Sequence, residues 1–375
     1  MRSDRRYSQC MLKEIHEQPE AVRRTLDGWV KNAHLLDGAF GPSARCVFER
    51  TEHVHIVGSG TSYHAGAVGR YLIEQICRLP CSVEVSSEYS YRKPAMPKRS
   101  LLVALGETAD TLAAARLAKR DGSFTLAICN ASESSLVRES DLMMHTRAGA
   151  ELAVSATKTF TTQLVALGLL VVALVRHRNN SPQQEGLLLE QLLALPAAID
   201  AVLALEPEIC ALARRLASER HALFLGRGVM YPIAMEGALK MKEVAYIQAE
   251  AYAAGELKHG PLALVDATMP VIAMVPCDAV LEKLKSNLME VRARKGHIIV
   301  LTDPGSGLVS DEGIASIAMP AGLTQLQCSV VYSVALQLLA FHVALLKGVD
   351  PGRPRGIVRV PSSRSAQTSL QTILS

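Results

Sequence analysis

One short stretch of the sequence, residues 250–264, brings together the side chains that acid–base chemistry requires. It places two carboxylates, Glu250 and Glu256, close to Lys258 and His259, with glycines between and after them. These groups can supply a base, an acid and a cation, and glycine lets the backbone turn sharply. The stretch predicts proton transfer on a small anionic molecule. An exposed loop with incidental charges is the alternative.

A second group of charged residues lies just upstream with helical spacing. Glu236, Lys240 and Glu243 are separated by four and three positions, which places them on one face of a helix. The spacing alone leaves two interpretations open, a catalytic face and an exposed ladder of ion pairs.

A glycine-rich turn earlier in the chain has the form of an anion site. Residues 58–62, Gly-Ser-Gly-Thr-Ser, follow an expected strand and open an expected helix. Backbone N–H groups and the helix dipole favour negative charge at a helix start, and Thr61 and Ser62 add hydroxyls. Tyr63 stands where a dinucleotide-binding turn needs a third glycine. We therefore expect the phosphate of a small molecule rather than NAD, with a plain tight turn as the alternative.

These residues need a scaffold, and the surrounding pattern alternates strands with helices. The expected strands lie at 55–57, 82–85, 100–105, 124–129, 142–145, 222–225, 271–275, 298–301 and 317–319. Such alternation predicts an α/β protein with doubly wound parallel sheets flanked by helices. Gly58, Gly60 and Tyr63 recur at 226, 228 and 231, which indicates two copies of one domain type.

The composition argues against several classes of function. The net charge is +4 and no long basic run occurs, so nucleic-acid binding has no support. None of the eight cysteines forms a Cys-x-x-Cys pair, so we expect no metal site, no disulfides and a cytoplasmic location. The basic start lacks the apolar segment of a signal peptide. The apolar runs 164–175 and 338–346 are shorter than the ~20 residues that span a bilayer, so buried helices are expected and a membrane is not.

Several motifs together resemble the isomerase half of the glucosamine-6-phosphate synthase family, whose members carry sugar isomerase (SIS) domains. The likeness runs from about residue 11 to 355. It rests on the stretches 236–243 and 250–264, and on shorter motifs at 12–19, 60–63, 106–111 and 281–287. The resemblance implies two SIS domains. We expect a helical lead-in at 1–44, a sugar-phosphate domain at 45–184, a domain with the catalytic helix and loop at 185–350, and a loosely ordered tail at 351–375.

The resemblance also implies roles for individual residues. Glu243 would move a proton between C1 and C2 of the sugar, His259 would assist ring opening from the neighbouring subunit of a homodimer, and Lys240 would hold the open-chain sugar beside Glu236. The substrate-binding residues implied are Thr61, Ser62, Thr108, Val154, Ser155 and Ala156. The ligand would be a hexose-6-phosphate or an amino-hexose-6-phosphate, with no cofactor.

Three departures from the family pattern bear on activity. Leu105 runs directly into Gly106, so the Ser-Gln-Ser that precedes this glycine in the family is missing, and we expect weaker phosphate binding. Ala156 stands where a serine is usual. Arg359 occupies the approximate place of a lysine that the family uses, and an arginine cannot form a Schiff base.

Three functions remain open at this point. The first is an aldose–ketose isomerase or aminotransferase-type enzyme on fructose-6-phosphate and glucosamine-6-phosphate, without glutaminase chemistry because these residues resemble only the isomerase half. The second is a SIS-type glucosamine-6-phosphate deaminase. The third is a non-catalytic remnant that binds sugar phosphates.

Overall fold

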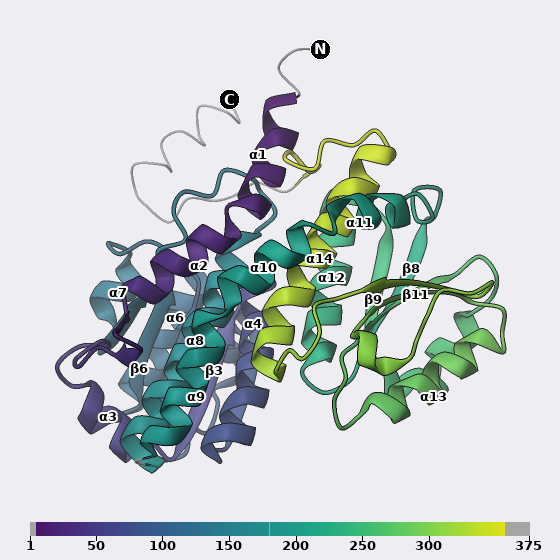
Figure 1. Cartoon of the computed structure of the whole chain (residues 1–375). Coiled ribbons are helices and arrows are strands. Elements are labelled where there is room, and N and C mark those ends of the chain that lie inside the picture. Colours follow the sequence, from purple (N-terminus) through teal and green to yellow (C-terminus); the bar gives the residue numbers. More distant parts are fainter. Residues whose placement is uncertain (1–4, 180, 357–375) are drawn as a thin grey trace. The chain divides into compact units, whose positions relative to one another are not determined.

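Two five-stranded parallel β-sheets form the framework of the protein (Figure 1). The computed structural model describes residues 5–179 and 181–356, and the statements below refer to that part of the chain. One sheet belongs to a compact unit made of Arg23–Ala150 and Thr162–Glu190, which we call the N-sheet unit. The other belongs to the C-sheet unit, made of Met1–Val22, Glu151–Thr161 and Gln191–Arg355.

The N-sheet unit has its strands in the order β4-β3-β5-β6-β7, and every neighbouring pair is parallel. The strands are β3 His53–Gly58, β4 Cys81–Val85, β5 Ser100–Leu105, β6 Phe124–Cys129 and β7 Leu142–His145. The helices between them are α4 Thr61–Leu72, η1 Ile73–Cys77, α5 Ser86–Arg92, α6 Ala109–Arg120 and α7 Ser135–Glu139. Strand β5 is buried along its whole length, as expected for a parallel strand covered on both faces.

The C-sheet unit has the order β12-β11-β10-β8-β9, again parallel throughout. The strands are β8 His221–Gly226, β9 Gln248–Ala253, β10 Pro270–Val275, β11 His297–Thr302 and β12 Ile314–Ala318. Its helices include α1 Arg5–His16, α10 Leu195–Leu203, α11 Glu206–Ala213, α12 Met230–Ala245, η3 Ala254–His259, η4 Pro261–Leu264, α13 Leu281–Arg292, η5 Pro304–Ser306 and α14 Gln325–Leu346.

The remaining elements are α2 Gln18–Asp27, β1 Val30–Lys31, β2 His34–Leu35, α3 Ala44–Arg50, α8 Lys158–Leu174, η2 Val175–Asn179 and α9 Pro182–Leu193. Helices α2, α8 and α9 each contain residues of both units.

In both sheets the second strand in sequence pairs on one side of the first strand, and the third strand pairs on its other side. In the N-sheet unit β3 pairs with β4 on one side and β5 on the other, and in the C-sheet unit β8 pairs with β9 and β10. The connections leaving β3 and β5 therefore diverge at the carboxyl edge. Open α/β sheets bind ligands at such a switch point, and the turn 58–62 and residues 106–108 lie there.

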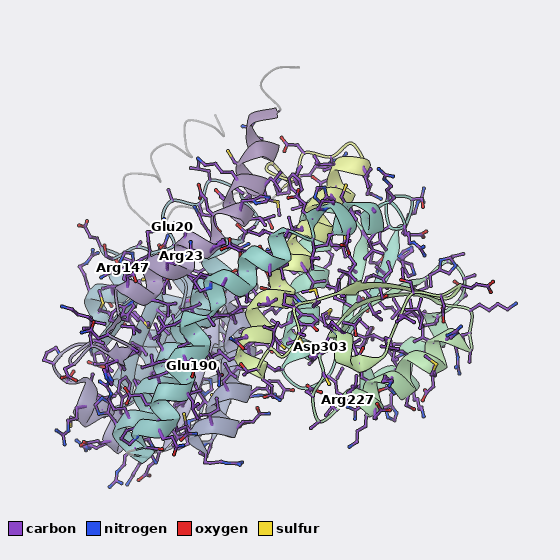
Figure 2. All side chains as sticks on the ribbon, in the orientation of Figure 1. Glu20, Arg23, Arg147, Glu190, Arg227 and Asp303 are labelled. Carbon is purple, nitrogen blue, oxygen red and sulfur yellow. The ribbon has the colours of Figure 1, made fainter. Side chains whose placement is uncertain are left out.

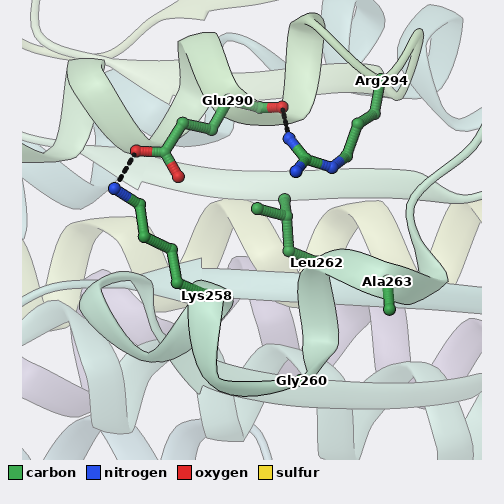
Figure 3. Close-up of a pocket in the computed structure, with 6 residues that line it drawn as sticks. All are labelled: Lys258, Gly260, Leu262, Ala263, Glu290 and Arg294. Atoms are coloured by element: carbon green, nitrogen blue, oxygen red, sulfur yellow. Dashed lines mark hydrogen bonds and ion pairs between the residues drawn. The ribbon is translucent and has the colours of Figure 1, made fainter.

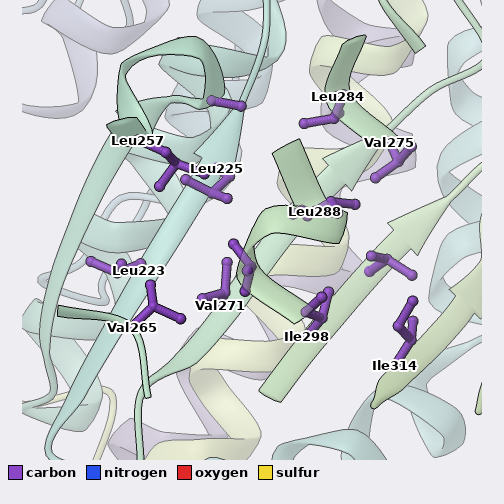
Figure 4. Packing of buried hydrophobic residues seen from close by; sticks show 14 of the residues in the cluster. Leu223, Leu225, Leu257, Val265, Val271, Val275, Leu284, Leu288, Ile298 and Ile314 are labelled. Carbon is purple, nitrogen blue, oxygen red and sulfur yellow. The ribbon is translucent and has the colours of Figure 1, made fainter. Parts of the chain in front are cut away.

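The core of the C-sheet unit shows how one sheet face is closed (Figure 4). Leu284 and Leu288 on α13 are spaced one helical turn apart and pack with Leu223, Val271 and other buried residues of the strands. These side chains are at most 3% exposed, and burial of each contributes about 1.5–3 kcal/mol. This packing fixes the sheet against which α12 packs and whose edge strand β9 leads into η3.

The α/β class, the parallel sheets and the flanking helices agree with the sequence-based prediction. Strands were predicted at 100–105, 124–129 and 142–145, where β5, β6 and β7 lie. Strand β9 is an edge strand with one neighbour, and it contains polar residues. These polar residues interrupt the apolar run, and the strand was missed for that reason. Arg359 and the tail from residue 357 lie outside the described residues.

Three helical segments among the described residues have the length and apolar composition to cross a membrane: Lys158–Arg178, Pro182–Leu203 and Gln325–Leu346. The apolar window is 94% buried in the first segment and 83% in the third, but 39% in the second. We expected from the sequence that these apolar runs are too short to span a membrane, and the lengths of the helices that contain them show that this was wrong. Burial inside the protein is what indicates core helices for the first and third segments.

Candidate active site

The charged helix face predicted from the sequence is a buried cluster on α12. The Lys240 side chain is 0% exposed, and its Nζ lies 2.7 Å from Glu243 Oε2 and 3.3 Å from Glu236 Oε1. The Glu236 side chain is 2% exposed and that of Glu243 is 19% exposed. This burial rules out an exposed ladder of ion pairs. Glu243 is the member of the cluster that solvent reaches.

A fourth side chain completes the cluster from another part of the sequence. Ser155 Oγ donates a hydrogen bond to Glu243 Oε2 at 2.7 Å and accepts one from Lys240 Nζ at 3.1 Å. Ser155 is 1% exposed. The sequence had identified Ser155 only as part of a sugar-binding loop, because a contact between residues this far apart in the chain leaves no local pattern. The neighbouring Val154 and Ala156 are partly exposed.

The electrostatics of the cluster keep Lys240 protonated. Burial by itself lowers the pKa of this amine, but the attraction of Glu236 and Glu243 outweighs that penalty and raises the pKa above its ordinary value of 10.5. A fixed ammonium group therefore lies beside a partly accessible carboxylate. This arrangement can remove a carbon-bound proton and stabilise the negative charge that develops.

Helix α12 is held close to its neighbours at Gly237. A Cβ at this position would come within 2.8 Å of Leu336 Cδ1 on α14 and within 3.0 Å of Phe224 Cε1 on β8. A larger residue here would displace the side chain of Leu336 or Phe224. The tight contact sets the position of the helix that carries Glu236 and Lys240.

The segment 250–264 does not form one charged site. Glu250 lies on β9 and accepts a hydrogen bond from Tyr252 Oη at 2.5 Å. Lys258 Nζ pairs with Glu290 Oε1 at 2.9 Å. His259 is exposed at the end of η3, whereas the bonds of Glu243 described above lead to Ser155 and Lys240.

An open surface pocket of about 580 Å³ lies beside this segment (Figure 3). Its lining residues are Lys258, Gly260, Leu262, Ala263, Glu290 and Arg294. Glu290 bonds both cations, since its backbone carbonyl also accepts from Arg294 Nη1 at 3.1 Å. The lining includes no member of the α12 cluster, so we assign the chemistry to the cluster and not to this pocket.

The predicted phosphate-binding residues lie in the N-sheet unit, at the carboxyl ends of the adjacent strands β3 and β5. Thr61 and Ser62 open α4, and Ser62 Oγ accepts a hydrogen bond from Gln163 Nε2 at 3.0 Å. Gly106 follows β5 with φ of +86°, and a Cβ there would lie 3.0 Å from Ser62 Oγ. The two loops therefore meet at the switch point. Gln163 was missed.

Thr108 is committed to a structural contact. Its side chain caps α6 by accepting from the Thr111 backbone N–H at 3.3 Å, and the two hydroxyls lie 2.8 Å apart. The cap occupies one lone pair of the hydroxyl that was expected to bind phosphate.

The corresponding edge of the C-sheet carries different side chains (Figure 2). Arg227, which follows β8, donates to Asn287 Oδ1 at 3.1 Å. Asp303, which follows β11, caps η5 through Gly305 N and also accepts from Gly322 N. Counted from the glycines that recur at 226 and 228, the positions equivalent to Thr61 and Ser62 are Val229 and Met230, which have no hydroxyl, so the phosphate site is predicted for the N-sheet unit alone.

Comparison with known proteins identifies the family of this chain. The model of the SIS domain family matches residues 48–173 and 215–347. Glutamine–fructose-6-phosphate aminotransferase [isomerizing] from Pseudomonas syringae pv. tomato is 51% identical over 358 residues, which cover 94% of this chain and 58% of the relative. The chain therefore spans little more than half of that relative's length.

Two solved structures are similar to the protein as well. The C-terminal domain of glucosamine-fructose-6-phosphate aminotransferase from Francisella tularensis has a TM-score of 0.89 and 43% identity, covering 92% of this chain and 98% of that one. Glucosamine-6-phosphate deaminase from Thermotoga maritima has a TM-score of 0.69 and 23% identity over 93% of this chain and 98% of that one, which shows a shared fold. The chain thus belongs to the SIS domain family, and it is similar over nearly its whole length to the C-terminal domain of glucosamine-fructose-6-phosphate aminotransferase.

Proposed function

We propose that this chain is an aldose–ketose isomerase for hexose-6-phosphates, with Glu243 as the base. The observation that carries the proposal is the buried Lys240, which holds a positive charge 2.7 Å from a carboxylate that remains partly open to solvent. Glu243 removes a proton from C1 of open-chain fructose-6-phosphate and the C–H electrons form an enediol. The same proton, or one from solvent, is returned to C2, the proton on O1 moves to O2, and glucose-6-phosphate results with no net change in atoms.

The other residues act on charge and binding. Lys240 stabilises the negative charge that develops on the sugar oxygens, and Glu236 holds Lys240 in place. Thr61 and Ser62 bind the phosphate at the start of α4, where the helix dipole favours an anion. His259 assists ring opening.

The aminotransferase-type activity uses the same proton shift. Ammonia condenses with the ketone of fructose-6-phosphate, water leaves, and transfer of a proton from C1 to C2 converts the imine into glucosamine-6-phosphate. The names of the relatives support this reaction. The reverse direction, release of ammonia from glucosamine-6-phosphate, is the deaminase alternative, because the same acid–base groups serve both directions.

A non-catalytic role is favoured by two specific observations. Leu105 joins Gly106 directly and the Thr108 hydroxyl caps α6, so two groups expected to bind phosphate are absent or engaged. This alternative predicts sugar-phosphate binding without turnover, or neither.

We further propose that the protein is a cytoplasmic homodimer in which His259 contributes to the active site of the neighbouring subunit. We also propose that it binds neither nucleic acid nor a membrane. The exposure of His259 at the end of η3 supports the shared site. Mixing the inactive variants Glu243→Gln and His259→Asn tests it. Subunit exchange should produce dimers with one intact site and restore about a quarter of wild-type activity, because half of the dimers are mixed and each has one working site of two. No recovery in verified mixed dimers would refute the shared site.

The direct test of function incubates the purified protein with fructose-6-phosphate, with and without ammonium, and separately with glucosamine-6-phosphate. Glucose-6-phosphate formation supports the isomerase. Ammonia release as the only activity supports the deaminase, and calorimetric binding without any turnover supports the remnant.

A further inference from the structure

The loop that carries Ser155 is held in place by the N-terminal helix. Glu14 on α1 is 4% exposed, and its Oε1 accepts hydrogen bonds from the backbone N–H groups of Leu152 and Ala153 at 2.5 and 3.2 Å. One carboxylate oxygen thus bonds two successive backbone amides, which lie three and two residues before Ser155 in the sequence. Buried amides that lose such a partner destabilise the local conformation.

Side chains from the α1–α2 region and from α14 fix the end of this loop. Lys158, 3% exposed, pairs with Glu17 Oε2 at 2.6 Å. Gln337 on α14 donates to the carbonyl of Thr157 at 3.4 Å and accepts from Gln18 at 2.9 Å. These contacts hold residues 157 and 158, whereas Glu14 is the group that bonds the backbone immediately before Ser155.

The start of α8 is fixed within the loop itself. Glu151 accepts from the backbone N–H groups of Thr157 and Thr159 at 2.9 and 3.1 Å. The loop is therefore closed on itself between residues 151 and 159. Its N-terminal side depends on Glu14 for the bonds at 152 and 153.

We propose that Glu14 is a positioning residue for the catalytic base: by fixing residues 152 and 153 it sets the place of Ser155, whose hydroxyl bonds Glu243 and Lys240. The proposal rests on the function proposed above for Glu243. The chain of contacts is short, since it passes from Glu14 to the loop backbone, along that backbone to Ser155, and through one hydrogen bond to Glu243.

The contact needs a hydrogen-bond acceptor and not a charge. Glu14 Oε1 makes both bonds, and Oε2 is buried without a hydrogen-bond partner among the described residues. Burial raises the pKa of Glu14, although the two amide bonds oppose the shift. A neutral glutamine keeps the accepting oxygen and the shape of the side chain, whereas alanine removes the acceptor and keeps the helix.

The test compares Glu14→Ala, Glu14→Gln and a matched control, Ile15→Val, which removes one methyl group from a fully buried neighbour on the same helix. Isomerisation of fructose-6-phosphate gives kcat and KM, and hydrogen–deuterium exchange reports on residues 151–158. Glu14→Ala should speed exchange at 152–155 at least about tenfold. It should lower kcat about tenfold to a hundredfold, because Ser155 donates to a charged carboxylate, with KM changed less than about threefold.

Glu14→Gln should restore kcat and exchange protection to within about threefold of wild type, and Ile15→Val should leave kcat within about twofold. The proposal is overturned if Glu14→Ala leaves kcat or loop exchange unchanged. It is also overturned if Glu14→Gln is as impaired as Glu14→Ala, or if Ile15→Val loses as much kcat at the same unfolding midpoint. If the wild-type protein shows no isomerisation, the proposed function fails. Loop exchange in Glu14→Ala then decides by itself whether Glu14 orders the loop.

Discussion

Replacing Lys240 by methionine should destabilise the C-sheet unit strongly. The substitution keeps an unbranched side chain of similar length in a fully buried position but removes the cation between Glu236 and Glu243. Glu236, with a side chain 2% exposed, then keeps a buried carboxylate without its counter-charge. Removing one partner of a buried ion pair costs about 3–5 kcal/mol, a large part of the ~5–15 kcal/mol that holds a typical domain folded.

The assay is urea unfolding followed by circular dichroism, with hydrogen exchange in α12 as a second probe. The single tryptophan, Trp29, belongs to the N-sheet unit, so hydrogen exchange in α12 is the probe that reports on the C-sheet unit directly. The double variant Lys240→Met/Glu236→Gln is the matched control. It removes the uncompensated charge as well and should recover about half of the lost stability or more.

The pH dependence of the same comparison has a defined sign. The pKa of Lys240 is raised by its two carboxylates despite burial, so its stabilising effect is complete below its unfolded value of about 10.5 and is lost as pH rises through the folded value. The stability gap between wild type and Lys240→Met should therefore be constant from about pH 7 to 9 and narrow above about pH 10.5. A gap below about 1 kcal/mol at pH 7 would show that the cluster is not a tightly coupled ion pair and would refute this reasoning.

Three other substitutions test separate parts of the account. Glu243→Gln should lower isomerase turnover by at least about a thousandfold, because an amide cannot accept the proton. The affinity for sugar phosphate, measured by calorimetry, should change less than about threefold. Unchanged turnover would show that Glu243 is not the base. Burial lowers the pKa of His55 to about 4, so the native state loses up to about 3 kcal/mol of stability as pH falls from about 6.5 to 4. The variant His55→Phe should reduce this dependence of unfolding free energy on pH, measured by Trp29 fluorescence. An equal pH dependence in wild type and variant would contradict the assignment. Inserting Ser-Gln-Ser between Leu105 and Gly106 should tighten hexose-6-phosphate binding by about two to four orders of magnitude, because it adds two hydrogen bonds to a charged oxygen. Equal affinity of both forms by calorimetry would show that these residues are dispensable.

The fold could be predicted from the sequence where burial leaves a simple pattern. Central parallel strands such as β5 and β6 are buried on both faces and read as continuous apolar runs, so their limits were predicted to the residue. Edge strand β9 mixes polar and apolar residues because it has a neighbour on one side only, and it was missed for that reason.

The candidate site was predictable in part for the same kind of reason. Helical spacing placed Glu236, Lys240 and Glu243 on one face, but spacing does not say whether that face is buried. The bond from Ser155 to Glu243 joins residues that are 88 positions apart, and that from Glu14 to Leu152 spans 138 positions. Such contacts are fixed by tertiary packing and not by local pattern. The motif at 12–19 pointed to the α1 region without indicating what its side chains contact.

The central claim is that Glu243, set beside the buried Lys240, moves a proton between C1 and C2 of a hexose-6-phosphate. Proton NMR of fructose-6-phosphate with the purified protein in D2O measures this step directly, with Glu243→Gln as the matched control. We predict glucose-6-phosphate that carries deuterium at C2 with the wild-type protein and none above background with the variant. Absence of both product and deuterium incorporation with wild-type protein, under conditions where calorimetry shows that the sugar phosphate is bound, would contradict the account.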